Sequence, residues 1–559
     1  MSSNAQTMTV SQYLLTRLKE IGIDDIFSVP GDFNLVFLDR VQDSGLINLI
    51  GDCNELNAAY AADGYARVKG VGAVITTFGV GELSAVNGIA GAYSEMVPVV
   101  KITGTPNTKS QASGALLHHT LGNGDFRAFQ KIFSHITITN TTLLPHNAAA
   151  EIDRVLTDCV QKVRPVYISL PTDVVDAEIT VDMKPLNLAL PHNPEKIEAA
   201  CIREIAKAVE AAKDPIIIAD ACAIRHHCEK ELLQLIEKTG LPYYTTPMGK
   251  AVVSESHPQF RGIYVGSLSN PRVKEEVENA DLILSVGGLK SDFNTGSFSY
   301  RMDTDKTVEM HSDYTDVFYG TYKAVGMKYL LPKLASTIPK REYKKTEALS
   351  TDLPQIDMKA MVPQAWFWPR MSHFFKANDI VVAETGTSVF GALNSHLPEG
   401  ATFISQILWG SIGYTVGSTL GAAVAGGPRR VILFVGDGSF QLTCQEISVM
   451  IRLGLHPIIF LLNNNGYTIE RLIHGVKRTY NDIDGWDFSK TLDYFGGAAG
   501  QDKIGFQGRA NTAEEFEQVL KKVEGYHDKI NFVEVMMDWL DAPENLVKQA
   551  EASAALNRS

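Results

Sequence analysis

The strongest hydrophobic pattern of the chain lies between residues 431 and 470. An unbroken apolar run at 431–435 is followed by an amphipathic stretch at 445–453, which stops at Gly454, and by a second apolar run at 457–462. Continuous apolar runs are typical of parallel strands that are buried on both faces, and the middle stretch has the spacing of a helix. The pattern therefore predicts a strand, a helix and a second strand, with the two strands parallel.

Apolar runs and helical stretches alternate in the same way along most of the chain, which predicts parallel sheets with helices between their strands. A chain of 559 residues is too long for one core. We expect an α/β protein of three consecutive domains, each built on an open and mostly parallel sheet. Their predicted bounds are 1–185, 193–340 and 362–559, with a solvated linker rich in Lys, Glu, Ser and Pro at 341–361.

Composition and charge narrow the choice of partners. The chain is 45% hydrophobic and 21% charged, as in ordinary globular proteins, and its net charge of −13 disfavours nucleic acid and anionic membranes as partners. It contains no apolar run of the roughly 18 residues that a membrane span needs. Residues 1–8 lack an apolar signal core and an Arg-rich transit pattern, and the six cysteines form no CxxC pair. We expect a cytoplasmic protein with reduced thiols and with no nucleic-acid or membrane partner.

Two polar side chains, Asp437 and Asn464, follow directly after the two predicted strands of the 431–470 segment. Because parallel strands end at the same edge of a sheet, we expect these side chains to converge there. With the backbone carbonyl of Gly466 they form a hard set of oxygen ligands, which suits Mg²⁺ when phosphate groups complete its octahedron.

The glycines around Asp437 would let a diphosphate approach the backbone closely. A simpler interpretation is that Gly436–Gly438 only forms a turn, but the Asn-Asn-x-Gly sequence at 463–466 favours the metal site. Two other phosphate motifs are absent from the sequence. Gln441 stands where a dinucleotide fingerprint needs Gly or Ala, and the Gly-Lys pair at 249–250 is followed by Ala instead of Ser or Thr.

Several longer segments make the chain recognisable. They are Gly436-Asp437-Gly438 with Asn463-Asn464, and the segments 55–67, 117–125, 405–412 and 466–470. On these residues the chain resembles the thiamine-diphosphate-dependent 2-oxo acid decarboxylases, and within that family most closely the fungal pyruvate decarboxylases. The resemblance extends from about residue 10 to about residue 552 and is weakest at 173–197 and 340–361.

The resemblance implies a fold of three open, mostly parallel-sheet α/β domains of the thiamine-diphosphate decarboxylase type. The first would bind the aminopyrimidine of the cofactor, the second would have a structural or regulatory role, and the third would bind diphosphate and Mg²⁺. The implied reaction is the non-oxidative decarboxylation of pyruvate to acetaldehyde and CO2 through an ylide and an enamine of thiamine diphosphate, as in alcoholic fermentation.

Three other functions remain open at this point. A decarboxylase of bulkier aryl 2-oxo acids, such as phenylpyruvate or indolepyruvate, would share the mechanism. The implied pocket is edged by Phe293, Val389 and Ile469, and Val389 is small enough to allow such substrates. A carboligase of the acetolactate-synthase type would usually add a flavin, and it lacks paired histidines in this context. A non-catalytic protein on the same fold is the third alternative, because occupied positions do not prove turnover.

Glu55 has two interpretations. Asn54 is a candidate N-cap, so Glu55 falls in the first turn of a helix, where an acid simply suits the helix dipole. The resemblance gives Glu55 a specific task, which is to hydrogen-bond the N1′ nitrogen of the aminopyrimidine so that the cofactor supplies its own base.

The resemblance places four further side chains at the reacting centre: Asp32, His118, His119 and Glu470. Asp32 lies on an irregular segment after a predicted strand, and Glu470 follows the loop that carries Asn464 and Gly466 of the predicted metal site. By residue type alone, two adjacent histidines are more often surface or satisfied polar residues. Because imidazoles and neighbouring carboxyls exchange protons near neutral pH, we expect these four groups to share the proton transfers, and the sequence does not divide the roles among them.

The resemblance also assigns contacts to the cofactor and the ion. Ile412 would be the wedge that bends thiamine diphosphate, although an ordinary core isoleucine fits the composition as well. Gly410 would offer its carbonyl to the 4′-nitrogen, and Gly81 and Glu82 would lie near the cofactor ring. The implied cofactor-binding residues are Glu55, Thr385, Gly386, Thr387, Gly410, Ser411, Ile412, Gly436, Asp437, Gly438, Ser439, Asn464, Gly466, Tyr467, Thr468 and Ile469. The implied metal ligands are Asp437, Asn464 and Gly466.

The resemblance further implies that the cofactor lies between the first domain of one chain and the third domain of another. A homodimer is then the minimal active unit, and a homotetramer is the expected assembly. Cys222 aligns with a cysteine proposed to mediate substrate activation in this family, but apart from Arg225 and His226 nothing nearby suggests a lowered thiol pKa. The alternative is an inert, buried thiol. Residues 540–559 look helical and would either close over the site or form an exposed tail.

Overall fold

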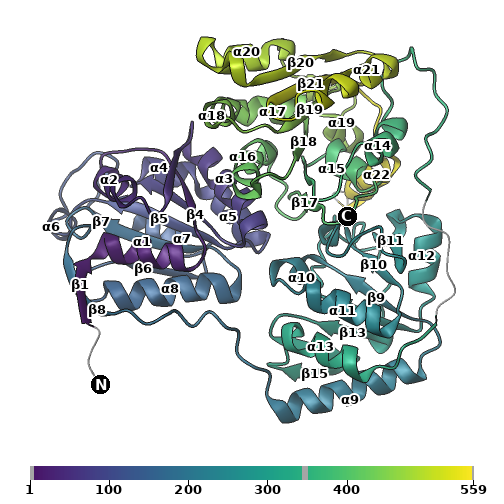
Figure 1. Cartoon of the computed structure of the whole chain (residues 1–559), viewed down its shortest axis with the longest axis horizontal. Coiled ribbons are helices and arrows are strands. Elements are labelled where there is room, and N and C mark those ends of the chain that lie inside the picture. The colour runs from purple at the N-terminus through teal and green to yellow at the C-terminus, as the bar shows by residue number, and fades with distance from the viewer. Residues whose placement is uncertain (1–4, 343–349, 557–559) are drawn as a thin grey trace.

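The computed structural model describes residues 5–342 and 350–556 of the chain. Three open sheets flanked by helices form three units, which we call the first, central and third unit in chain order and which meet near the middle of the molecule (Figure 1). The prediction of an α/β protein with mostly parallel sheets is confirmed. Residues 343–349 of the predicted linker, the first four residues and the last three residues of the predicted C-terminal helix lie outside the described part.

The first unit contains a six-stranded sheet. Its strands are β2 (Asp25–Ser28), β3 (Asn48–Gly51), β4 (Gly72–Thr77), β5 (Val99–Thr105), β6 (Thr139–Thr142) and β7 (Val166–Pro171). They run parallel in the order β3-β2-β4-β5-β7-β6. Its helices are α1 (Val10–Glu20), α2 (Leu35–Ser44), α3 (Glu55–Lys69), α4 (Val80–Ser84), α5 (Val86–Ser94), α6 (Thr108–Ala112), α7 (Ala128–Phe133) and α8 (Ala148–Lys162). The unit also contains an antiparallel ribbon of β1 (Ala5–Thr9) and β8 (Glu178–Asp182).

The central unit contains a seven-stranded sheet. Its strands are β9 (Pro215–Ala219), β10 (Tyr243–Thr245), β11 (Phe260–Ile263), β12 (Leu282–Val286), β13 (Thr307–Met310), β14 (Tyr314–Val317) and β15 (Gly320–Lys323), in the order β11-β10-β9-β12-β13-β14-β15. The strands from β11 to β13 are parallel, and β14 and β15 add an antiparallel edge. The helices are α9 (Glu195–Ala211), α10 (Ala221–Arg225), α11 (Glu229–Thr239), α12 (Pro271–Glu278) and α13 (Met327–Thr337).

The third unit contains a six-stranded parallel sheet. Its strands are β16 (Ile380–Ala383), β17 (Thr402–Ile404), β18 (Val431–Gly436), β19 (Ile458–Asn463), β20 (Ile504–Ala510) and β21 (Ile530–Met536), in the order β17-β16-β18-β19-β21-β20. The helices are α14 (Gln364–Ser372), α15 (Thr387–Ala392), α16 (Tyr414–Gly426), α17 (Asp437–Thr443), α18 (Ile447–Leu453), α19 (Thr468–Ile473), α20 (Thr491–Gly496), α21 (Ala513–Glu524) and α22 (Glu544–Leu556).

The predicted strand–helix–strand segment is confirmed as β18, α18 and β19, and the two strands are parallel neighbours. The structure adds α17, which starts at Asp437 directly after β18 and buries Phe440 in the core. The apolar spacing from 445 onward could not predict this extra helix, because it begins with Asp, Gly and Ser, which are more typical of a turn.

The first and third units share a tightly packed seam. Helix α3 packs against α16, and one apolar cluster contains buried residues of both units. The approach depends on glycines, since a Cβ atom at Gly64 would lie 2.1 Å from the Ser418 carbonyl oxygen, and one at Gly421 would lie 1.8 Å from the Ala61 carbonyl oxygen. Any larger residue at either position would push the two helices apart.

The first and third sheets have corresponding switch points, where consecutive connections leave in opposite directions. In the first sheet this point lies between β2 and β4, and in the third sheet it lies between β16 and β18. Ligands of open α/β sheets bind outside the carboxyl ends of the strands at such points. The carboxyl edges of the first and third sheets are therefore candidates for one site or for two half-sites. None of the helices that the structure describes is both long enough and apolar enough to cross a membrane.

Candidate active site

Asp437 occupies the first position of α17 at the switch point of the third sheet. Its side chain is only 2% exposed. Oδ1 accepts a hydrogen bond from the backbone N–H of Gly438 at 2.9 Å, and Oδ2 accepts one from the N–H of Gly466 at 3.0 Å. Burial raises the pKa of Asp437 to about 6, although the backbone donors partly oppose this shift. A bound cation would favour the carboxylate further, so this position suits a metal ligand.

Asn464 brings a third oxygen-bearing group to Asp437 and Gly466. One end of its side-chain amide lies 3.0 Å from the Gly466 carbonyl oxygen and 3.1 Å from Asp437 Oδ1. When the amide oxygen occupies that end, three oxygens form a triangle. Neighbouring ligands of an octahedral Mg²⁺ with bonds of about 2.0–2.1 Å are about 2.8–3.0 Å apart, so the separations of 3.0 and 3.1 Å are close to those of neighbouring ligands. The predicted convergence of Asp437, Asn464 and Gly466 is confirmed.

The remaining residues assigned to the cofactor in the third unit surround this triangle. Gly386 (φ 110°) links β16 to α15, and a Cβ atom there would lie 4.0 Å from Ile469 Cγ2. Thr385 and the buried Thr387 belong to the same turn. The Thr385 hydroxyl donates a hydrogen bond to the Gln406 carbonyl at 3.0 Å. A Cβ atom at Gly410 would lie 3.7 Å from Thr385 Cγ2. The turns after β16 and β17 therefore lie side by side.

The turn after β18 packs against the loop after β19, which carries Asn464, Gly466 and Tyr467. A Cβ atom at Gly438 would lie 2.6 Å from the ring of Tyr467, so only glycine allows this approach. Gly436 faces open space, and Ser439 is buried one residue beyond Gly438. We call this turn, residues 436–439, together with residues 464–468 the metal cradle. It is open at Gly436 and closed behind Gly438, as a diphosphate site requires.

Ile412 is 36% exposed, and Trp409 beside it is 42% exposed. The interpretation of Ile412 as an ordinary core residue is therefore wrong. Its neighbour Ser411 turns the other way, and its hydroxyl lies 2.6 Å from the Tyr60 hydroxyl of the first unit. The loop 409–412 thus presents its large apolar side chains outward while it is tied to α3.

Glu384 is an organising residue of this cradle that the sequence analysis missed. It is 1% exposed, and its carboxylate accepts hydrogen bonds from the N–H groups of Thr385 and Gly413 at 3.0 and 3.2 Å and from the Thr415 hydroxyl at 2.5 Å. Burial raises the pKa of Glu384 to about 7. The acid directly after the apolar residues 380–383 is the sequence signal that could have identified it.

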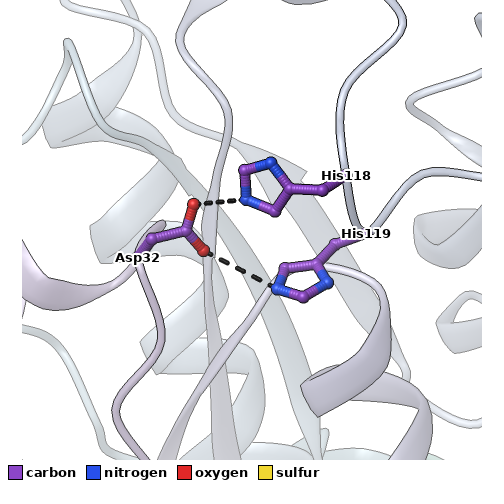
Figure 2. Close-up of side chains that lie close together, drawn as sticks. All are labelled: Asp32, His118 and His119. Carbon is purple, nitrogen blue, oxygen red and sulfur yellow. Dashed lines mark hydrogen bonds and ion pairs between the residues drawn. The ribbon is translucent and has the colours of Figure 1, made fainter.

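In the first unit, Asp32, His118 and His119 form a compact cluster at the carboxyl edge (Figure 2). His118 Nε2 lies 2.5 Å from Asp32 Oδ2, and His119 Nε2 lies 3.8 Å from Asp32 Oδ1. Phe33 stacks on the His118 ring with a centroid distance of 5.0 Å. The short contact between carboxylate and imidazole suits proton sharing.

The histidine loop rests on a small apolar cluster. Buried Phe78, Phe126 and Phe129 form its centre, with Phe33 and Leu117 packed against them. His119 has a positive φ of 61°, and a Cβ atom at Gly79 would lie 2.0 Å from its carbonyl oxygen. A glycine at 79 is therefore needed to hold the histidines at this edge.

Glu55 begins α3, as predicted, and Asn54 caps the helix by accepting the N–H of Asn57 at 2.8 Å. The Glu55 carboxylate borders Gly81, where a Cβ atom would lie 2.9 Å from Oε1. Glu82 is instead buried and accepts hydrogen bonds from the Gly79 N–H and the Tyr167 hydroxyl at 2.8 and 2.9 Å. Of the pair 81–82, only Gly81 lies beside Glu55, and the Glu82 carboxylate is engaged within the unit.

Within the described residues, no hydrogen bond or ion pair joins Asp32, Glu55, His118 or His119 to the metal cradle of the same chain. Glu470 is exposed on α19, next to the partly buried Ile469. Both edges carry exposed apolar side chains: Val80 and Leu83 near Gly81 are 53% and 38% exposed, and Leu442 at the end of α17 is 50% exposed. Each of the two edges therefore carries a part of the residue set that the resemblance assigns to the site, and we call these parts the two half-sites.

Phe293, Val389 and Ile469 belong to one apolar cluster beside the cradle, in which Val389 is buried and the other two are partly buried. The ring of Phe293 meets that of Phe390 edge to face at 6.0 Å. The residues of the predicted pocket edge thus belong to one apolar cluster that the central and third units share.

Cys222 lies on α10 and is 6% exposed. Its Sγ contacts Met96 Sδ of the first unit at 3.4 Å. Burial raises the pKa of Cys222 to about 12, although Arg225 and Arg164 oppose the shift. Burial also lowers the pKa of His226 to about 4, so this imidazole adds no positive charge at neutral pH. The thiol is therefore protonated and a poor nucleophile.

Comparisons with known proteins agree with the two half-sites. Residues 8–129 match the N-terminal TPP binding domain of thiamine pyrophosphate enzymes, 202–327 match their central domain, and 384–535 match their C-terminal TPP binding domain. The chain is 47% identical to pyruvate decarboxylase isozyme 2 of Saccharomyces cerevisiae over 564 residues, which covers 98% of this chain and 99% of that protein. It is also 47% identical to the pyruvate decarboxylase of Aspergillus fumigatus, with 98% and 97% covered. The pyruvate decarboxylase of Candida albicans is 47% identical, with 98% and 99% covered.

Proposed function

The chain belongs to the thiamine pyrophosphate enzymes, and on that premise we propose that it decarboxylates pyruvate to acetaldehyde and carbon dioxide. The observation that carries the proposal is the identity with fungal pyruvate decarboxylases over nearly the whole length of the chain, since it covers both half-sites and the connection between them. Thiamine pyrophosphate, also called thiamine diphosphate, is the cofactor.

The residues of the third unit would hold the cofactor's diphosphate through Mg²⁺. Asp437, Asn464 and Gly466 supply three oxygens to the ion, and the turns at 385–387 and 436–439 leave room for phosphate oxygens. When bound, the cofactor supplies a nucleophilic carbon and an electron sink for the electrons released by decarboxylation. Glu55 would bind the N1′ nitrogen of the aminopyrimidine, with the space beside Gly81 open to the ring.

The chain's own titratable groups handle the protons. Conversion of pyruvate to acetaldehyde and CO2 consumes one proton for each turnover. His118 lies within hydrogen-bonding distance of Asp32 at 2.5 Å and His119 lies 3.8 Å from it, so this cluster could deliver that proton. Glu470 is the first carboxyl after residues 464–466.

A homodimer is the minimal active unit of this proposal. Each active site would combine the first unit of one chain with the third unit of its partner, and a homotetramer would contain two such dimers. The exposed apolar residues at both edges support this arrangement. So does the lack, among the described residues, of a hydrogen bond or ion pair from Asp32, Glu55, His118 or His119 to the proposed metal ligands. The proposed domain bounds are 1–185, 193–340 and 362–559, with the linker at 341–361. In this proposal the protein is a cytoplasmic enzyme of alcoholic fermentation.

Decarboxylation of phenylpyruvate or indolepyruvate is the second candidate. The apolar wall of Phe293, Val389 and Ile469 supports it, because a valine at its centre leaves more room than an aromatic residue would. The role of Cys222 in substrate activation, if there is one, would have to arise from its packing against Met96, since burial disfavours its thiolate.

Acetaldehyde release from pyruvate tests the proposal. The purified protein is assayed with thiamine diphosphate and Mg²⁺ added together, added singly or withheld, beside phenylpyruvate and indolepyruvate. We expect turnover that requires both additions and prefers pyruvate. Preference for an aryl substrate would keep the mechanism and change the substrate, whereas no turnover of any of the three would reject the proposal.

A further inference from the structure

Thr468 lies directly behind the proposed metal site. It is the first residue of α19 and is 2% exposed. Its Oγ1 lies 2.8 Å from the far end of the Asn464 amide, and it donates a hydrogen bond to the Trp539 carbonyl at 3.0 Å. Its backbone N–H donates to the Gly466 carbonyl at 3.1 Å. One threonine therefore contacts two of the three proposed ligands and the segment that follows β21.

We infer that the Thr468 hydroxyl is a positioning group that turns the Asn464 amide oxygen toward the ion and couples cation binding to the Trp539 segment. The inference rests on the proposed Mg²⁺ site. It follows from counting hydrogens, because a hydroxyl has a single hydrogen to donate but can accept two hydrogen bonds.

The hydroxyl hydrogen can be used in two ways. If it points to the Trp539 carbonyl, Oγ1 can only accept from Asn464, so the amide NH2 faces Thr468 and the amide oxygen faces Asp437 and Gly466. If it points to Asn464, the amide oxygen must face Thr468 and the NH2 donates to Asp437 and Gly466. The Trp539 carbonyl then loses its donor, and no other donor reaches it from the part of the chain that the structure describes.

A cation decides between the two arrangements. An amide oxygen 3.0 and 3.1 Å from two other oxygens is repelled by them when nothing positive lies between, and the three become favourable ligands when an ion does. Without the ion, the amide donates to Asp437 and Gly466. With the ion, the amide turns over, the hydroxyl rotates, and the Trp539 carbonyl gains a hydrogen bond.

The Trp539 segment is placed to transmit this change. It connects β21 to α22, and α22 packs against α19, where buried Leu546 and partly buried Leu472 share one apolar cluster. The helix α19 also carries Ile469 and Glu470. Cation binding should therefore fasten the C-terminal helix more firmly to the helix that borders the reacting centre.

Direct measurement of cation binding tests the inference. Mn²⁺ binding in the presence of thiamine diphosphate is followed by the loss of the free-ion electron paramagnetic resonance signal. We expect Thr468→Val to weaken Mn²⁺ binding by about 10-fold, the lower end of the range for loss of an outer-shell partner. Thr468→Ser keeps the hydroxyl and should bind nearly as the wild type does. Equal Mn²⁺ affinity of the wild type and Thr468→Val would overturn the inference.

A second pair of variants distinguishes a loss of the Asn464 amide orientation from general damage to the proposed metal site. Asn464→Asp presents an oxygen to the ion in either orientation, so the loss of the hydroxyl should matter far less there. We expect Thr468→Val to reduce Mn²⁺ affinity much less in the Asn464→Asp background than in the wild type. An equal loss in both backgrounds would mean that Thr468→Val damages the site without acting through the amide, and the inference would be wrong.

The wild-type protein provides a test that needs no variant. With thiamine diphosphate present throughout, addition of Mg²⁺ should slow hydrogen exchange in peptides that cover Trp539 and α22. Unchanged exchange in these peptides would overturn the coupling. A protein that binds Mn²⁺ as expected but does not turn over pyruvate would reject the proposed function and leave this inference intact.

Discussion

The metal cradle of the third unit and the histidine cluster of the first unit occupy corresponding places on two sheets of the same kind, yet they differ in burial. Asp437 and Asn464 are 2% and 4% exposed, and backbone N–H groups fix the aspartate from two sides. The side chains of Asp32 and His118 are 45% and 59% exposed and are joined by one short contact. The residues proposed to hold the ion and the diphosphate are thus buried by their own chain, whereas the residues proposed to move protons are largely exposed.

This difference separates two kinds of defect. A change in the cradle should remove the cofactor from the protein, while a change in the histidine cluster or at Glu55 should leave the cofactor bound and slow turnover. Measuring retained cofactor and turnover on the same samples tests the distinction directly.

The largest effect is expected for Asp437→Ala. The substitution removes an ion ligand and the acceptor of two backbone N–H groups, so it should cost more than the roughly 100-fold that follows from losing an outer-shell partner. Activity should fall to background, and thiamine diphosphate should not survive gel filtration with the protein. Prolonged treatment of the wild type with a chelator should release the cofactor in the same way. Retention of the cofactor by Asp437→Ala would show that the cradle does not depend on the ion.

Glu55→Gln should give the next largest effect. Gln keeps the size of the side chain and the helix start at Asn54, but it cannot offer a carboxylate to the aminopyrimidine. Turnover should fall by roughly 10²–10⁴-fold, the usual range for loss of acid–base assistance. Bound cofactor, measured by its absorbance after denaturation, should remain near the wild-type amount. Near-normal turnover would remove Glu55 from the mechanism.

Asp32→Asn should have a smaller effect, by roughly 10²-fold in kcat, because the histidines and Glu470 remain to share the proton transfer. The substitution removes the carboxylate that lies 2.5 Å from His118 Nε2. The matched control is Asp176→Asn, an exposed acid of the same unit that pairs with Arg40 at 2.8 Å. A similar loss in both variants would indicate general damage to the first unit.

Sequence patterns were sufficient where a feature depends on neighbours along the chain. The continuous apolar runs of β18 and β19 predicted two parallel strands, and the crossover rule then placed Asp437 and Asn464 at one edge. The N-cap at Asn54 was predictable for the same reason, because its partner Asn57 is three residues away.

Features that depend on distant partners could not be predicted in this way. The Thr468 hydroxyl meets a carbonyl 71 positions later, and His118 meets Asp32 across 86 positions. The role of Glu384 depends on N–H donors from another loop. Composition and spacing contain no information about such pairs, so the histidine cluster was expected only because the chain resembles a known family.

The smallest expected effect concerns the seam that joins the two regions within one chain. Asp52, after β3, is half-buried, and Glu446, in the turn between α17 and α18, is fully buried. Neither Oε atom of Glu446 nor Oδ1 of Asp52 has a hydrogen-bond partner among the described residues. Burial raises the pKa of Glu446 to about 7 and raises that of Asp52 as well. Cys53, Asn57 and Arg452 also border the pair, and Arg452 opposes the shift only weakly. Burial therefore favours the protonated form of these acids.

The sign of the effect on stability follows from linkage. The folded protein holds a proton on Glu446 that the unfolded chain releases above the ordinary Glu pKa of 4.5. The contribution of this group to the free energy of unfolding is therefore fully present below about pH 4.5 and is lost as pH rises through about 7. Glu446→Gln keeps a hydrogen-bond donor for Asp52 without a titrating proton. The melting temperature of the protein without cofactor should therefore fall less between pH 5 and pH 8 in Glu446→Gln than in the wild type, by a few degrees. Glu514→Gln, an exposed acid in the first turn of α21, should reproduce the wild-type dependence. If Glu446→Gln and the wild type lost the same number of degrees, the acid pair would not be the pH-sensitive part of the seam that α3 and α16 form.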